Sequence, residues 1–232
     1  MKGLLKRNIR FLSRITAIPL VLSIIVVSLC MWIETVYGVE FHLIVMDMGF
    51  IETISEYVPP LFWLLIHFGS VLILTLKLSE DERDNEDILL VRVASKNAYH
   101  FSYMAAVILV QTLFVTALIV AGSIIGFGQS WQIIFIREAI IFIANITLFS
   151  CTVLLFSRRI PYIAVFTIAC AYQIAITFTN IRWLPGQSSL LGKQDFIVQG
   201  GMTFTEGMTV IAVWAAVLFI LNFIFSKLWD RW

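Results

Sequence analysis

The sequence contains unusually little charge. Only 13% of its 232 residues are Asp, Glu, Lys or Arg, whereas 60% are hydrophobic. A soluble globular domain has about 25% charged and about 45–50% apolar residues, so this composition argues against a soluble fold. It predicts an all-α integral membrane protein that forms one domain over residues 1–232. The net charge of +1 identifies no partner, because the charges are clustered.

Cysteine and the common catalytic motifs are also scarce. Cys30, Cys151 and Cys170 each lie in an apolar run without a CxxC spacing, which excludes a disulfide framework and a thiolate metal site. The chain has no GxSxG and no HExxH. The stretch "GQSSLLGKQ" departs from a phosphate-binding loop, because its glycines are one residue too far apart and Gln194 replaces the magnesium-binding Ser or Thr. We therefore expect no enzymatic activity, no cofactor and no metal in this chain.

Long apolar runs are what the sequence does have. Spanning a bilayer takes about 20 mostly apolar residues, and six segments are predicted to do so: 15–37, 59–78, 100–126, 132–156, 161–181 and 208–228. With the N-terminus in the cytoplasm, only Arg137, Arg182 and Lys193 of the 16 basic residues lie outside. The positive-inside rule thus predicts that both termini are cytoplasmic.

The N-terminus carries a basic stripe, because Lys2, Lys6, Arg10 and Arg14 recur every four residues. Apolar residues between them suit an amphipathic helix lying at the inner membrane surface. A basic flank that only sets topology explains the stripe equally well.

Polar side chains inside the predicted spans are few and, apart from one histidine, are not ionisable. The candidates for a translocation path are His67, Gln111, Asn145, Gln173, Thr177 and Asn180. Residues 173, 177 and 180 would share one face of a helix, either lining a path or bonding to a neighbouring helix. Ion-coupled carriers usually need charged groups at mid-membrane, so energy would have to come from elsewhere. An intramembrane enzyme is a further hypothesis, which only His67 and these amides support.

One dense charged segment, residues 79–99, separates the second and third predicted spans. Six of the eight residues 80–87 are acidic, and the apolar and basic stretch "ILLVRVASK" follows. Since a tight connection needs only about two to eight residues, the extra length predicts a short helix that docks on a cytoplasmic partner.

The pattern acid–x–x–Leu–Leu–x–Arg–x–x–Ser–Lys in this segment, together with six spans, resembles the permeases of type-2 ABC exporters. The resemblance implies that the segment is the coupling helix, which contacts a separate ATPase. Carried over by position, the coupling residues are Glu86, Leu89, Leu90, Arg92, Ser95 and Lys96. Val93 and Ala94 stand where that family often has a proline.

The resemblance further implies ATPase subunits that bind ATP and magnesium, and a second permease subunit forming a homo- or heterodimer. It implies a multi-pass protein of the bacterial plasma membrane that exports a small amphipathic substrate such as a peptide. Residues 196–207 would form a short helix dipping into the membrane. No nucleic-acid partner is expected.

The alternative is a non-transporting membrane protein, an immunity or assembly factor. Such a protein would bind a cytoplasmic partner through the acidic residues 80–87 themselves.

Overall fold

The computed structural model describes residues 2–37, 68–91, 96–125, 133–179, 181–190, 195 and 199–229. Over these residues the chain is 87% helical and has no β-strand. Its α-helices are α1 (Lys2–Tyr37), α4 (Ser70–Val91), α5 (Lys96–Ile125), α6 (Ile133–Ser157), α7 (Tyr162–Ala175) and α8 (Phe204–Trp229). The short 3-10 helices η3 (Ile176–Phe178) and η4 (Gln187–Ser189) lie between α7 and α8.

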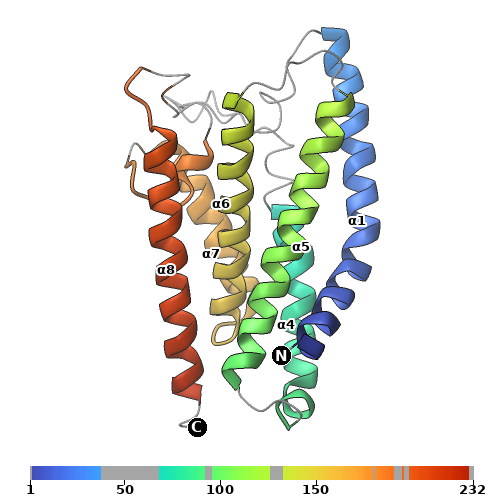
Figure 1. The fold of residues 1–232 in the computed structure, drawn as a ribbon, viewed down its shortest axis with the longest axis vertical. Coiled ribbons are helices and arrows are strands. Elements are labelled where there is room, and N and C mark those ends of the chain that lie inside the picture. The colour runs from blue at the N-terminus through green and yellow to red at the C-terminus, as the bar shows by residue number, and fades with distance from the viewer. Residues whose placement is uncertain are drawn as a thin grey trace.

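The long helices lie side by side in one bundle and alternate in direction along the chain (Figure 1). Both termini lie at the same end of the bundle, at the bottom of the view. The helices α5 and α6 are central: 50% of the most apolar part of α5 and 61% of that of α6 is buried, against 17% for α1 and 22% for α8.

Within the part of the chain that the structure describes, four segments are long and apolar enough to cross a membrane. They are Gly3–Ile25, Ala98–Ala121, Ala139–Ser157 and Phe204–Phe225. The apolar helix Tyr162–Ala175 is shorter. The chain is therefore an all-α membrane protein, as its composition predicted, and four of the predicted spans overlap these segments. The predicted span 59–78 falls partly outside the described residues, and only its second half lies in α4.

The N-terminal segment is not a separate interfacial helix, because α1 runs unbroken from Lys2 to Tyr37. Its early turns pack on the bundle: Asn8, Leu12 and Thr16 are spaced four apart and are all buried. Lys6 and Arg10 stay exposed. These buried residues hold the N-terminal turns against the bundle. The segment therefore does not lie flat at the membrane surface, which is the position that the basic stripe suggested.

The acidic segment is likewise no separate short helix. Helix α4 continues through it as far as Val91. The stretch Ser70–Val91 contains neither Gly nor Pro to end a helix. Its charges are also partly paired, since Lys77 lies 2.8 Å from Glu80 one turn later. Residues 86–91 of the expected coupling segment therefore form the C-terminal end of a long helix.

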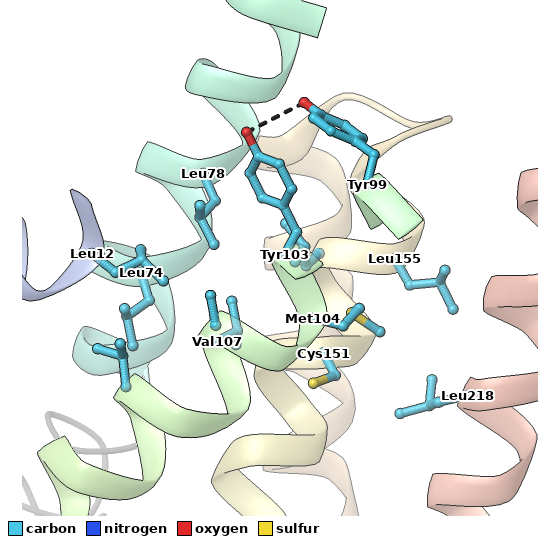
Figure 2. Packing of buried hydrophobic residues seen from close by; sticks show 13 residues of the cluster. Leu12, Leu74, Leu78, Tyr99, Tyr103, Met104, Val107, Cys151, Leu155 and Leu218 are labelled. Carbon is cyan, nitrogen blue, oxygen red and sulfur yellow. Dashed lines mark hydrogen bonds between the residues drawn. The ribbon is translucent and has the colours of Figure 1, made fainter. Parts of the chain in front are cut away.

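Two clusters of buried apolar side chains hold the bundle together, and α5 and α6 contribute to both. One joins α5, α6 and α7 through residues such as Phe114, Phe142 and Val165. The other, shown in Figure 2, joins α1, α4, α5, α6 and α8. There Leu12 and Leu74 face Val107 of α5, and Leu218 comes from α8.

The outward faces of the helices are apolar. Ile18 of α1 is 72% exposed and Ile163 of α7 is 77% exposed, while Phe219 of α8 is 60% exposed. Such a surface would be an aggregation hazard in water, whereas in hydrocarbon it needs no cover. The exposed faces therefore agree with a bundle surrounded by lipid.

Two neighbouring positions of α6 test this division between core and lipid face. Phe142 is buried and Ile140 is 44% exposed. We expect Phe142→Ala to lower the Tm of the purified protein by about 4 to 8 °C, because the cavity left behind costs about 2 kcal/mol or more. Ile140→Ala should change the Tm by less than about 2 °C. Equal shifts in the two variants would contradict the assignment of these faces.

Candidate functional site

The residues predicted to contact an ATPase lie where α4 ends and α5 begins. Glu86, Leu89 and Leu90 belong to the last turns of α4, and Lys96 is the first residue of α5. Arg92 and Ser95 fall outside the described residues. The end of α4 and the start of α5 lie at the same end of the bundle as both termini (Figure 1).

A polar cluster fastens the middle of α4 to its neighbours. One guanidinium nitrogen of Arg7 donates to both carboxylate oxygens of Asp81, at 2.9 and 3.0 Å. The hydroxyl of Tyr103 donates to the same carboxylate at 2.7 Å. The other terminal nitrogen of Arg7 lies 3.3 Å from the Tyr103 hydroxyl. We call Arg7, Asp81 and Tyr103, with the residues that bond to them, the Arg7 cluster.

Further bonds extend the Arg7 cluster along α5. The Tyr99 hydroxyl donates to that of Tyr103 at 3.3 Å, as Figure 2 shows. Next to Arg7, the Asn8 amide donates to the Ser102 hydroxyl at 3.0 Å. The cluster thus joins α1, α4 and α5 through charge-assisted and neutral hydrogen bonds.

Burial makes the Asp81 carboxylate dependent on these partners. Its side chain is only 9% exposed, whereas that of Arg7 is 36% exposed. Removing one partner of a largely buried pair leaves an uncompensated charge, which is strongly destabilising. Asp81, the second residue of the acidic run, therefore has a structural role. It holds α4 against its neighbours at the point from which the remaining turns of α4 extend.

A cavity of about 550 Å³ lies beside α7, and we call it the α7 cavity. Helices α6, α7 and α8 wall it with apolar side chains that include Phe149, Ile168 and Trp214. Asn145 of α6 and Gln173 of α7 supply amides to its lining. Two residues predicted to line a path are thus brought to one cavity, although they lie on different helices.

A buried loop closes the cavity at this polar end. Gln187 donates to the carbonyl oxygens of Ile176 and Thr179, at 2.6 and 2.9 Å. Asn145 donates to the Ser188 hydroxyl at 3.0 Å. The Tyr172 hydroxyl donates to the Pro185 carbonyl at 2.8 Å. These bonds satisfy polar groups that would otherwise be costly inside a membrane.

The loop changes direction at Gly186, whose φ is 96°. A Cβ added there would lie 2.5 Å from the Ile176 Cδ1 and 2.9 Å from the Gln173 Oε1. Glycine is required at this position both for the backbone angle and for the space. It lets the loop backbone pack directly on the Gln173 amide.

The predicted polar stripe of residues 173, 177 and 180 is interrupted. Helix α7 ends at Ala175, and Thr177 belongs to η3. The side chain of Thr177 is not described, and Asn180 lies outside the described residues, as does His67. The stripe assumed an α-helix through residue 180. Bonds from Gln187 to the carbonyls of Ile176 and Thr179 accompany the change to 3-10 geometry instead.

Gln111, the remaining path candidate, lies at a different place in the bundle. It is buried in α5 and donates to the Ser70 hydroxyl of α4 at 2.7 Å. This bond joins two helices, which is one of the two roles considered for the polar residues.

The segment expected to dip into the membrane, 196–207, is organised differently where it is described. Residues 199–203 are irregular and α8 begins at Phe204. A capping box sets this start: Glu206 accepts from the Thr203 backbone at 2.8 Å, and its own backbone donates to the Thr203 hydroxyl at 3.2 Å. The buried short element is η4, farther back in the sequence.

Sequence reasoning missed the Arg7 cluster and the loop of η4. Arg7 and Asp81 are 74 residues apart, and each stands among several like charges, so nothing local singles them out. The signal for the loop was "PGQSS", a proline and glycine followed by small polar residues that can turn and bond inward.

A double-mutant cycle tests the Arg7 cluster. We expect Asp81→Asn to destabilise the protein by about 1 to 3 kcal/mol, because Arg7 loses its counter-charge. Arg7→Met combined with Asp81→Asn should cost less than the sum of the single changes, with a coupling of about 1 kcal/mol. The matched control is Glu80→Gln, since Glu80 is 41% exposed and pairs with Lys77 at the surface; it should cost less than about 0.5 kcal/mol. If the destabilisation of the double variant equalled the sum of those of the two single variants, a direct interaction between Arg7 and Asp81 would be contradicted.

Two glycines with positive φ separate backbone strain from crowding. Gly200 has φ 79° and nothing within 4 Å of an added Cβ, whereas Gly186 is crowded. We expect Gly200→Ala to cost about 1 to 2 kcal/mol for its backbone angle. Gly186→Ala should cost about 1 to 3 kcal/mol more for the overlap. Thermal unfolding of both variants measures the difference, and equal costs would mean that the loop packs less tightly than described.

The described residues hold no group of three or more His, Cys, Asp or Glu side chains that could bind a metal ion. No protein-family model, curated protein or solved structure matches the chain. The membrane fold, the Arg7 cluster and the α7 cavity are therefore the observations on which a function can be based.

Proposed function

We propose that this chain is the transmembrane subunit of an ABC exporter, with six spans and cytoplasmic termini. It would move a small amphipathic substrate across the bacterial plasma membrane with a separate ATPase. A second permease subunit, identical or different, would complete the path. The ATPase would bind ATP and magnesium, and this chain would hold no cofactor.

The observation that carries this proposal is the continuity of α4 with the segment predicted to couple. Helix α4 extends from Ser70 to Val91 without a break. Asp81 binds it to α1 through Arg7 and to α5 through Tyr103. A push on the end of α4 would therefore move three helices together. A flexible acidic loop would transmit no such movement.

The direction of the helices supports cytoplasmic termini. Helices α1, α4, α5, α6, α7 and α8 alternate along the bundle, so both termini lie on one side (Figure 1). The end of α4, the start of α5 and the α6–α7 turn, which carries Arg158 and Arg159, lie at that same end. The positive-inside rule assigns this end to the cytoplasm.

The need for an external energy source follows from the spans. Ala98–Ala121, Ala139–Ser157 and Tyr162–Ala175 contain no Asp, Glu, Lys or Arg. Coupling to a proton or sodium gradient usually uses such residues at mid-membrane. Energy entering through the C-terminal end of α4 is the simplest alternative.

Co-purification tests the proposal directly. A tagged chain extracted from its native membrane should bring with it an ATPase subunit in stoichiometric amount. Membranes containing both should hydrolyse ATP, and a detergent-stable complex should be seen by mass spectrometry. Isolation of the chain without any ATPase, from membranes that hydrolyse no ATP in its presence, would reject the proposal.

Charge changes at the end of α4 distinguish the exporter from an immunity or assembly factor. Arg92→Glu with Lys96→Glu should lower coupled ATPase activity by about tenfold or more, because the docking face changes sign. The matched control neutralises Glu82, Asp84 and Asp87 and leaves Asp81 intact. The exporter should tolerate this control, whereas a factor that binds through its acids should lose its partner. The Tm reports whether each variant is folded.

A further inference from the structure

The wall of the α7 cavity is apolar, and the cavity opens at the perimeter of the bundle, on the face that suits lipid. Ile168 lines the cavity and is also 65% exposed. Phe149 and Phe156 of α6 and Trp214 of α8 form the inner walls. Because the outer faces of these helices suit lipid, a ligand can reach the cavity from within the bilayer. Its volume of about 550 Å³ falls in the range of about 300–1,000 Å³ that small-molecule sites occupy.

The ligand must be uncharged where it meets the protein. None of the described residues that line the cavity is Asp, Glu, Lys, Arg or His. A phosphate or a carboxylate inside it would have no cation to pair with, at a depth where an unpaired charge is expensive. The polar groups on offer are neutral hydroxyls and amides.

One of these amides lacks a partner. Gln173 is only 3% exposed and lines the cavity. Its side chain makes no hydrogen bond to another described residue, whereas Asn145 bonds to Ser188 and Tyr172 bonds to Pro185. Gly186 packs against both polar atoms of the Gln173 amide, which limits where this side chain can move. A buried amide with a free donor and acceptor calls for a ligand that supplies the complementary pair.

The depth of this amide distinguishes a lipid from a peptide. Gln173 lies next to Gly186, and Ser188 of the same loop bonds to Asn145. Asn145 is the middle residue of α6 and lies about 18 Å from either end at 1.5 Å per residue. The ester of a bilayer lipid lies at the interface, about 15 Å from the membrane centre. It would not reach Gln173. A peptide bond carries its donor and acceptor at any depth.

We infer that the α7 cavity binds a short apolar peptide segment, whose backbone amide exchanges hydrogen bonds with the Gln173 side chain. The apolar side chains of the segment fill the space between Phe149, Phe156, Ile168 and Trp214. The assignment of this peptide as an exported substrate rests on the proposed function. Binding itself needs neither the ATPase nor a second permease subunit.

Photo-crosslinking of the purified chain in lipid nanodiscs tests the site. The probe is acetyl-leucyl-photoleucyl-leucinamide, a neutral tripeptide with a diazirine side chain, and mass spectrometry locates the label. We expect labelling of the segments around Phe149 and Ile168, with displacement by excess unlabelled acetyl-trileucinamide. Gln173→Leu should reduce labelling by about tenfold, since the amide pair is lost. Ala169→Trp, which fills the cavity, should abolish it.

The matched control is Gln111→Leu. It removes another buried amide, which lies outside the cavity and whose nitrogen is already bonded to Ser70, and it should leave labelling unchanged. Gln173→Leu should keep or raise the Tm, because it removes an unpaired polar group from an apolar site. Loss of labelling in that variant would then not reflect unfolding.

A second arm uses nanodiscs in which phosphatidylglycerol carries the diazirine on an acyl chain. If lipid labels the cavity of the wild type and Ala169→Trp removes that label, while the tripeptide labels nothing, an acyl chain is the occupant and the inference is overturned. Tripeptide labelling spread over exposed positions such as Ile163 and insensitive to Gln173→Leu would also overturn it. Because no ATPase is present, either result is independent of co-purification.

Discussion

The architecture of this protein depends on one constraint: a polar group left without a partner inside a bilayer is costly. The Arg7–Asp81 pair meets this constraint at the end of the bundle that carries the termini. Bonds from Gln187 to the carbonyls of Ile176 and Thr179 meet it where α7 ends. Apolar contacts alone would leave the helices free to slide in hydrocarbon, whereas these directional bonds fix their register.

Helices α5 and α6 are central for the same reason. Each carries polar side chains that reach different neighbours: Gln111 and Tyr103 bond to α4, while Asn145 bonds to the loop of η4. The outer helices α1 and α8 are less enclosed, since only 17% and 22% of their most apolar parts is buried. The bundle therefore has polar bonds within an apolar core, and an apolar perimeter where a soluble helical protein carries its charged and polar residues.

The sequence predicted the long spans well, because a run of about 20 apolar residues is a local property. The segments Ala98–Ala121 and Ala139–Ser157 fall within the predicted boundaries to a few residues. Helix ends set by distant partners were not predictable. The end of α7 coincides with hydrogen bonds from Gln187. Helix α4 continues through its acidic residues, one of which, Asp81, pairs with Arg7 near the start of α1. The two amides of the cavity were identified, but their meeting required the loop at Gly186.

The Arg7 cluster also imposes an order on biosynthesis. Arg7 precedes Asp81 by 74 residues and Tyr103 by 96 residues, so it is synthesised well before both of its partners. Helix α1 is therefore inserted into the membrane before its main partner, α5, has been synthesised. Its charged end can leave the water only after α4 and α5 have been inserted. If translation stops after α1 but before α5 is made, α1 remains unpaired and exposed to membrane quality control. The chain is therefore most prone to degradation before residue 103 has been synthesised.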